Sequence, residues 1–291
     1  MFTQSKYINP FTDFGFKKIF GEEASKKSLM SFLNDVLPIE KKIKEVTFLP
    51  ASQLGNQVED RAAIYDIFCE DEAGSQFIVE MQNARQIYFK DRSVFYSTFP
   101  IQKQAEKGDW NFKLKEVYCV SLLGFEMPGE GEEYLHKVQL KNQNNKVFYD
   151  KLTYIYIELP KFNKEITELE NHLEKWLYFL KNLEKFESLP EVFREEIFME
   201  TLDRIEVLSL NKEEYLSYER SLKYYRDRVN EIETAKEEGR EEGREEGREE
   251  GEKSKALEIA KNLLDILDDE TIALKTGLSI EEVKNLRKDR R

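Results

Sequence analysis

Two acidic residues interrupt apolar runs within one short stretch of the chain. Asp66 lies in the run 63–68, and Glu80 lies in the run 77–81. A turn-forming segment separates the runs and has Gly74 placed for a positive φ, and this pattern predicts a β-hairpin. A strand with apolar neighbours on both sides of a carboxylate is unusual, because burying a lone charge is costly. The two acids are therefore the first candidates for chemistry.

The geometry of such a hairpin brings the acids together with an amide. A hairpin folded about Ala73 places Asp66 opposite Glu80, and directly opposed residues have Cβ atoms roughly 4.5–5.5 Å apart. Glu80 and Gln82 share a face because side chains alternate along a strand. Two carboxylates this close repel, which raises one pKa unless a cation lies between them; hard oxygen ligands suit Mg²⁺ or Mn²⁺. Two alternatives stay open: a bulge at Gly74 that shifts the register, and an edge hairpin whose acids face water.

Four stretches of the sequence resemble one nuclease family. Asp66 followed by Glu80-Met81-Gln82 is similar to the D…(D/E)-x-K core of the PD-(D/E)XK nuclease superfamily, with Gln in place of Lys. More narrowly, the chain resembles the Rpn-like recombination-promoting nuclease and transposase family. The segments NPFTDFGFKKIFG (9–21) and EKWLYFL (174–180) add to this resemblance, which spans roughly the first two-thirds of the chain.

The resemblance implies a metal-dependent DNA endonuclease with a role in recombination, mobile elements or defence. Asp66 and Glu80 would hold Mg²⁺ (or Mn²⁺), with the main-chain carbonyl of Met81 as a further ligand, and Gln82 would orient the attacking water. Gln82 departs from the superfamily motif, although the resemblance implies that Gln is familiar at this position in the narrower family. A Lys carries charge, whereas a Gln only forms hydrogen bonds. A second hypothesis is therefore a catalytically lapsed nuclease fold that binds DNA or a protein partner.

The apolar periodicity predicts the elements that position these residues. A helix spans 13–37 with an interruption at Gly21, a short strand spans 45–50, and the hairpin follows. A helix at 87–107 and a buried strand at 115–123 come next. This order agrees with an α/β, restriction-endonuclease-like PD-(D/E)XK core, a mixed central sheet flanked by helices, with an all-helical C-terminal part. The order of elements comes from periodicity, and the pairing of the strands comes from the resemblance.

Several polar side chains are candidates for contact with DNA. They are Lys17 and Lys18 on the first helix, Arg92 and Gln104 on the helix 87–107, and Lys284 and Arg287 near the C-terminus. The alternative is that these residues form ordinary solvated faces. The net charge of −13 argues against DNA binding by bulk electrostatics, so any contact would be local.

The sequence predicts four parts: a nuclease-like domain at 1–160, a helical subdomain at 161–232, a tetrad repeat at 233–254 and a small helical tail at 255–291. The repeat, (K/R)-E-E-G four times over 236–251, has a Gly every four residues. Each Gly costs a helix roughly 0.8–1 kcal/mol against Ala, more than the roughly 0.2–0.5 kcal/mol of each Glu-x-x-Arg pair. Two interpretations follow: a flexible charged linker, or a helix whose glycine stripe forms a homodimer. A protein that acts only through such assembly is a third functional hypothesis.

The tail resembles a helix-turn-helix over residues 272–283. Ser279 and Glu282 form a predicted capping box at the start of its last helix. Glu281 and Glu282 lie at the end that would enter a DNA groove, which counts against reading of base sequence. DNA contact and a purely structural helical tail both stay open.

The composition also excludes several classes. No run of about 18 apolar residues predicts a membrane span, and the first residues lack the apolar stretch of a signal peptide. Cys69 and Cys119 lie in strand-like runs, which predicts reduced, buried thiols and a cytoplasmic protein. No phosphate-binding glycine motif indicates a nucleotide cofactor. His136 and His172 have no nearby nucleophile that would form a hydrolase triad.

Overall fold

The computed structural model describes residues 5–40, 42–53, 63–105 and 108–289, which form two compact units, 1–227 and 228–291. The helices are α1 (Asp13–Phe20), α2 (Lys26–Val36), α3 (Phe89–Lys103), α4 (His172–Asn182), α5 (Glu196–Ile205), α6 (Lys212–Leu263), α7 (Asp269–Thr276) and α8 (Ile280–Lys288). The strands are β1 (Val46–Phe48), β2 (Ser52–Gln53), β3 (Ala63–Ile64), β4 (Ile67–Asp71), β5 (Gln76–Gln82), β6 (Val117–Leu123), β7 (Leu135–Lys141) and β8 (Val147–Glu158).

The first unit is built on a mixed six-stranded sheet with the order β1-β4-β5-β6-β8-β7. β4 pairs antiparallel with β5, whereas β5, β6 and β8 are parallel. A parallel pair needs a crossover, and α3 lies in the crossover between β5 and β6. The predicted α/β class and its mixed sheet are thereby confirmed.

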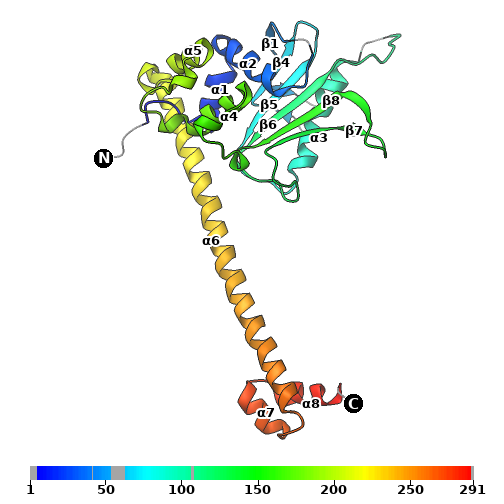
Figure 1. Ribbon diagram of the computed structural model, residues 1–291. Helices are drawn as coiled ribbons and strands as arrows, with labels where there is room; N and C mark the ends of the chain where they lie inside the picture. Colours follow the sequence, from blue (N-terminus) through cyan, green and yellow to red (C-terminus); the bar gives the residue numbers. More distant parts are fainter. Residues whose placement is uncertain (1–4, 41, 54–62, 106–107, 290–291) are drawn as a thin grey trace. The chain divides into compact units, whose positions relative to one another are not determined.

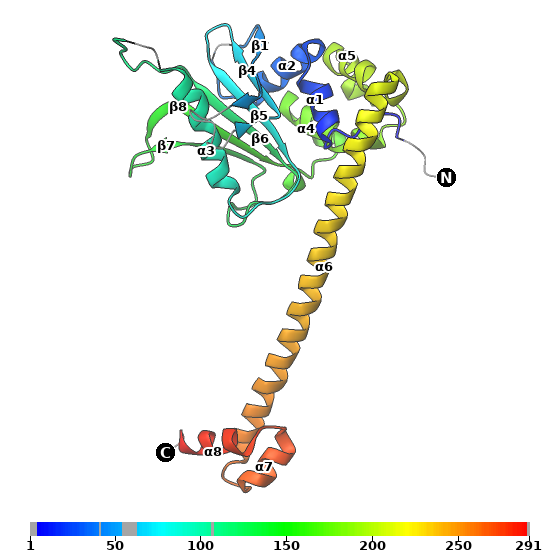
Figure 2. The same cartoon turned by 180° about the vertical axis from the view of Figure 1, so that it is seen from behind.

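Helices cover both faces of this sheet (Figures 1 and 2). α1, α2, α4 and α5 lie on one face, and α3 lies on the other. The alternation along β5 separates the two sides: Phe77 and Val79 belong to the larger hydrophobic cluster, and Ile78 belongs to the cluster beneath α3. Glu80 and Gln82 have the same parity as Ile78, so they point toward the α3 side.

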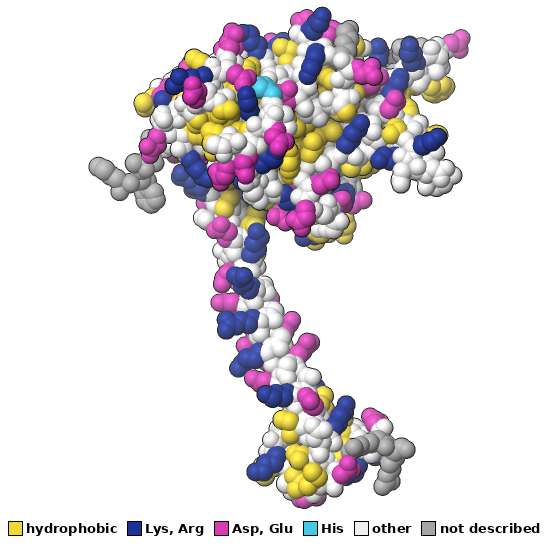
Figure 3. Space-filling model, viewed as in Figure 1, with side chains coloured by type: hydrophobic (Ala, Val, Ile, Leu, Met, Phe, Trp, Pro, Cys, Tyr) yellow, Lys and Arg dark blue, Asp and Glu magenta, His cyan; other side chains and the backbone are white. Residues whose placement is uncertain are grey.

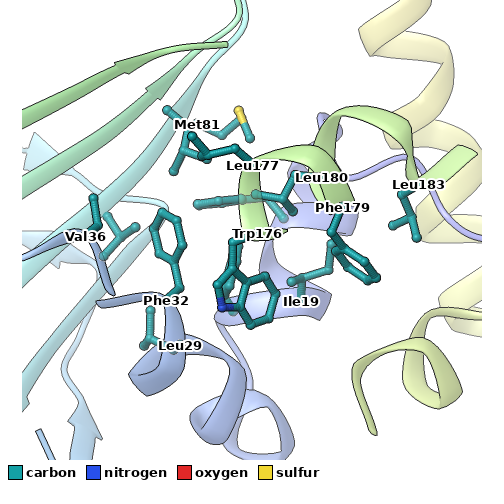
Figure 4. Packing of buried hydrophobic residues seen from close by; sticks show 14 of the residues in the cluster. Ile19, Leu29, Phe32, Val36, Met81, Trp176, Leu177, Phe179, Leu180 and Leu183 are labelled. Carbon is teal, nitrogen blue, oxygen red and sulfur yellow. The ribbon is translucent and has the colours of Figure 1, made fainter. Parts of the chain in front are cut away.

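The larger core joins the sheet to helices from both ends of the first unit. Trp176 of α4 is fully buried, and its ring lies 5.5 Å from Phe20 and 4.7 Å from Phe198, measured between centroids. Figure 4 shows Trp176 within this cluster, with Phe32 and Met81 on the side toward the strands. The helices after residue 161 therefore complete the core of the nuclease-like part.

The predicted hairpin forms, but its first strand is broken. The run 63–68 splits into β3, which pairs with β2, and β4, which pairs with β5. Tyr65 lies at the break, where it is buried and donates a hydrogen bond from its hydroxyl to the Tyr96 carbonyl (2.9 Å). A single strand over 63–68 is therefore wrong, because the Tyr65 side chain turns into the core under α3. Arg61 and Ala62 lie outside the described residues.

The turn of the hairpin matches its prediction. Gly74 has φ of +82°, and the strand register runs without a shift from Ile67–Val79 to Glu70–Gln76. The alternative of a register shifted by one residue is therefore excluded.

The tetrad repeat is helical throughout. α6 runs without interruption from Lys212 to Leu263, so a flexible linker is not what the structure shows. Basic and acidic side chains are interspersed along α6 (Figure 3). Apart from the neighbouring backbone of α6 itself, a Cβ added at any of its four glycines would meet no atom within 4 Å.

In the second unit, the end of α6 packs with α7 and α8 around a small core that includes Ala260, Ile272 and Val283. The predicted capping box is present, with reciprocal hydrogen bonds between Ser279 and Glu282. Among the described residues, no helix is both long and apolar enough to cross a membrane.

Candidate active site

The break before β4 puts a carboxylate, that of Asp66, beside β5 at the point where β4 begins. Ile67 pairs with Val79, so the register places Asp66 beside Glu80, as the sequence predicts. Asp66 Oδ2 accepts a hydrogen bond from the main-chain N–H of Met81 (2.8 Å). This bond takes the place of the main-chain hydrogen bond that the Met81 N–H would make if β4 began earlier. It also fixes the orientation of the carboxylate.

The main chain of β5 contributes a second oxygen on the same edge. The carbonyl of Gln82 points toward β6, where it accepts a hydrogen bond from the N–H of Gly124 (2.8 Å). The N–H and C=O of one strand residue point to the same neighbour, and this direction alternates along the strand. The Met81 carbonyl therefore lies on the Asp66 edge, beside the Met81 N–H.

Glu80 occupies an unfavourable environment for a carboxylate. It is only 8% exposed, and burial together with the nearby charge of Asp66 raises its pKa to about 7. The Arg92 charge and the Gln82 hydrogen bond act in the opposite direction. Burial also raises the pKa of the Asp66 carboxyl, and the Asp13 charge adds to this, against the Met81 N–H and the charges of Lys17 and Arg92. The nearby positive charges are therefore too few to offset the burial and mutual repulsion of the Asp66 and Glu80 carboxylates.

Gln82 links Glu80 to α3. Its Nε2 donates to Glu80 Oε2 (3.1 Å), and its Oε1 accepts a hydrogen bond from Arg92 Nη2. Arg92 Nη1 also donates to Gln86 Oε1 (2.6 Å). Arg92, a residue predicted to contact DNA, thus joins the three residues predicted to be catalytic. Gln86 was not predicted, although it lies in the polar connection that directly follows the motif.

α1 approaches the site from the other side. Thr12 caps this helix by accepting a hydrogen bond from the N–H of Gly15, and Asn83 Nδ2 ties it to β5 by donating to the Phe11 carbonyl (2.6 Å). Lys17 pairs with Asp13 (2.7 Å), and the charges of both act on Asp66. Lys17 is therefore near Asp66. Asp13 was not among the predicted site residues, although its spacing of four residues from Lys17 was visible.

Other predicted DNA-contact residues are engaged elsewhere. Lys18 forms ion pairs with Glu22 and Glu214, and Gln104 Oε1 accepts a hydrogen bond from the N–H of Lys115. In the second unit, the Arg287 guanidinium donates hydrogen bonds to the Asp269 carboxylate and to the main-chain carbonyls of Leu264 and Leu267. Lys284 lies in the same unit and is exposed. DNA contact by these four residues stays a prediction.

The donor set fits a hard divalent cation. Among the described residues, no group of three or more His, Cys, Asp or Glu side chains could hold a metal ion. Mg²⁺, however, is commonly bound through one or two carboxylates and keeps several waters. Asp66, Glu80 and the Met81 carbonyl offer such a set of oxygens. The Cys119 thiol has its pKa raised by burial and by the Glu80 charge, so it stays protonated and is a poor ligand.

The mixed sheet has two adjacent carboxylates, one directly before β4 and one within β5. This arrangement is consistent with an α/β fold of the PD-(D/E)XK type. A family model for "PD-(D/E)XK nuclease family transposase" matches residues 10–235. The chain therefore belongs to this family, which confirms the resemblance seen in the sequence. The match stops just before the repeat at 236–251. Neither a curated protein nor a solved structure matches the chain.

Proposed function

We propose that the protein is a metal-dependent endonuclease that hydrolyses phosphodiester bonds of DNA. The observation that carries this proposal is the contact between Asp66 and the Met81 N–H, which holds one carboxylate beside the buried Glu80. Both carboxyl pKa values are raised, and a cation bound between the two groups would relieve that cost. Membership of a nuclease and transposase family supports DNA as the substrate and a role in recombination or mobile elements.

The residues divide the work as follows. Asp66, Glu80 and the Met81 carbonyl would hold Mg²⁺ (or Mn²⁺), which lowers the pKa of a bound water and stabilises charge on the phosphate. Gln82 turns its amide nitrogen toward Glu80, from where it orients the water. Lys17 is 44% exposed near Asp66 and is available to a DNA phosphate. The buried, free Cys69 and Cys119 are compatible with the predicted cytoplasmic location.

A catalytically lapsed nuclease that binds DNA or a protein is the second candidate function. The observation that favours it is Gln82, which leaves the third motif position without charge. Assembly into a homodimer through 236–251 is a separate prediction. It is supported by the glycines of this segment, which are open on the surface of α6.

The nicking of supercoiled plasmid tests the first proposal against the second. We expect the full chain to cut with Mg²⁺ or Mn²⁺ and not with EDTA, and we expect Asp66→Asn and Glu80→Gln to lose on the order of 100-fold in rate. Glu70→Gln is the matched control, because Glu70 is a partly buried carboxylate on the same hairpin. Equal cutting by all variants would place the activity elsewhere. Binding without cutting by the wild-type protein would favour the second candidate.

A further inference from the structure

Position 82 has a Gln where the superfamily motif D…(D/E)-x-K has a Lys. A Lys supplies two things at such a position, hydrogen-bond donors and a positive charge, whereas a Gln supplies only donors. The groups that contact Gln82 therefore decide whether the charge comes from another residue.

Arg92 of α3 is the cation that contacts Gln82. Its guanidinium donates one hydrogen bond to Gln82 Oε1 and another to Gln86 Oε1, and it lies 5.7 Å from the centroid of the Tyr96 ring. A planar guanidinium with fixed donor directions is well suited to such a defined position. The first turn of α3 supports it, because the N–H of Arg92 bonds to the Tyr88 carbonyl (3.0 Å) and Phe89 is buried.

The contact determines which way the Gln82 amide faces. Its oxygen is occupied by Arg92, and its nitrogen therefore points to Glu80 at 3.1 Å. An amide held in this way presents only N–H groups toward Glu80. The side chain of Gln82 thus offers the donors of a Lys without its charge.

The charge of Arg92 reaches both carboxylates. It lowers the pKa of Asp66 and the pKa of Glu80, opposing the effect of burial on each. Lys17 acts on Asp66 from the α1 side. Arg92 is therefore the described cation that acts on the pair as a whole.

Building on the nuclease function proposed above, we propose that Arg92 and Gln82 together replace the motif Lys. Gln82 supplies the hydrogen-bond donor, and Arg92, reaching in from α3, supplies the positive charge and holds the amide in place. Arg92 is a positioning residue, because its hydrogen bond goes to Gln82 and its charge acts on the two carboxylates. Its role is distinct from an ordinary contact with the DNA backbone.

This role has a signature that other roles lack. A guanidinium close to the carboxylates repels a divalent cation, so its removal tightens metal binding while it slows the chemical step. A backbone contact with DNA would instead raise KM and reduce the salt dependence of binding. A merely structural role would lower thermal stability and weaken metal binding.

Calorimetric titration of Mn²⁺ into the full chain at pH 8.5 tests this inference, together with kcat and KM for plasmid nicking. For Arg92→Gln we expect Mn²⁺ to bind roughly three- to ten-fold more tightly. We expect kcat to fall about ten-fold or more with KM within about two-fold. Arg92→Lys keeps the charge and should retain much of kcat. Lys90→Gln removes a charge from the same helix, where Lys90 pairs with Glu130, and should leave Mn²⁺ affinity unchanged.

Moving the charge back to position 82 is the most specific part of the test. We expect Gln82→Lys to restore most of the kcat that Arg92→Gln loses, when the two changes are combined. The inference would be overturned if the Arg92→Gln protein bound Mn²⁺ with wild-type affinity, or if the substitution changed only KM. Either result would leave the nuclease proposal standing. Failure of the nuclease proposal looks different: the wild-type protein would bind no Mn²⁺, or Glu80→Gln would bind it equally well.

Discussion

Replacement of Glu80 by Gln is expected to stabilise the metal-free protein at alkaline pH. In the folded protein, burial and the Asp66 charge raise the pKa of Glu80 to about 7, whereas an unfolded chain has the ordinary value near 4.5. The folded state therefore binds this proton more tightly than the unfolded state does. Stability from this group is complete below pH 4.5 and is lost as the pH rises from there to about 7.

The size of the effect follows from the same two values. One pKa unit corresponds to about 1.4 kcal/mol, so ionisation of Glu80 costs the folded protein about 3 kcal/mol at pH 8 and less than about 1 kcal/mol at pH 5. Gln has nearly the same shape and no charge. Glu80→Gln should therefore exceed the wild type in unfolding free energy by up to about 3 kcal/mol at pH 8, with a much smaller difference at pH 5.

Urea unfolding in EDTA at the two pH values measures this difference, with the emission of the buried Trp176 as the probe. Mg²⁺ at 1,000 times Kd should reverse the order, because only the wild type gains binding free energy, about 4.1 kcal/mol, which exceeds the difference of about 3 kcal/mol. Glu158→Gln is the contrasting control. Glu158 is also buried but is paired with Lys161 (2.9 Å) and His136 (2.6 Å), so its loss should destabilise the protein. A Glu80→Gln protein less stable than the wild type at pH 8 in EDTA would refute the reasoning.

Two further predictions concern other parts of the fold. Gly243→Ala and Gly247→Ala should each stabilise α6 by about 1 kcal/mol, seen by circular dichroism as a higher melting temperature, because an added Cβ meets no atom within 4 Å. If the glycine stripe instead holds a second copy, the same changes should lower the mass found by light scattering. For His172, the hydrogen bond to Asp35, with the charges of Asp35 and Glu195, raises the pKa, so its contribution to stability is present below about pH 6.5 and lost above the raised pKa. His172→Gln should therefore destabilise the protein more at pH 6 than at pH 9 in urea unfolding, and an equal loss at both would contradict the ion pair.

The sequence predicted the features that depend on local chemistry. The positive φ of Gly74, the capping box of Ser279 and the register that sets Asp66 beside Glu80 all follow from residues close together in the chain. The order of strands and helices also followed, because apolar periodicity reflects burial on one face. These features can be predicted from the local sequence pattern alone.

The features that were missed depend on distant partners. The break at Tyr65 exists because its hydroxyl reaches the Tyr96 carbonyl, 31 residues along the chain. The link from Arg92 to Gln82 depends on where α3 packs against the sheet. Neither partner can be identified from spacing, because an apolar stripe on a helix does not say which strand it covers.

Diffraction from crystals soaked in Mn²⁺, collected at a wavelength where manganese scatters anomalously, tests the central claim most directly. The account predicts an anomalous peak in contact with carboxylate oxygens of both Asp66 and Glu80 and with the Met81 carbonyl, and the loss of this peak in Glu80→Gln crystals. Manganese bound elsewhere on the protein, with no peak between these two carboxylates, would contradict it.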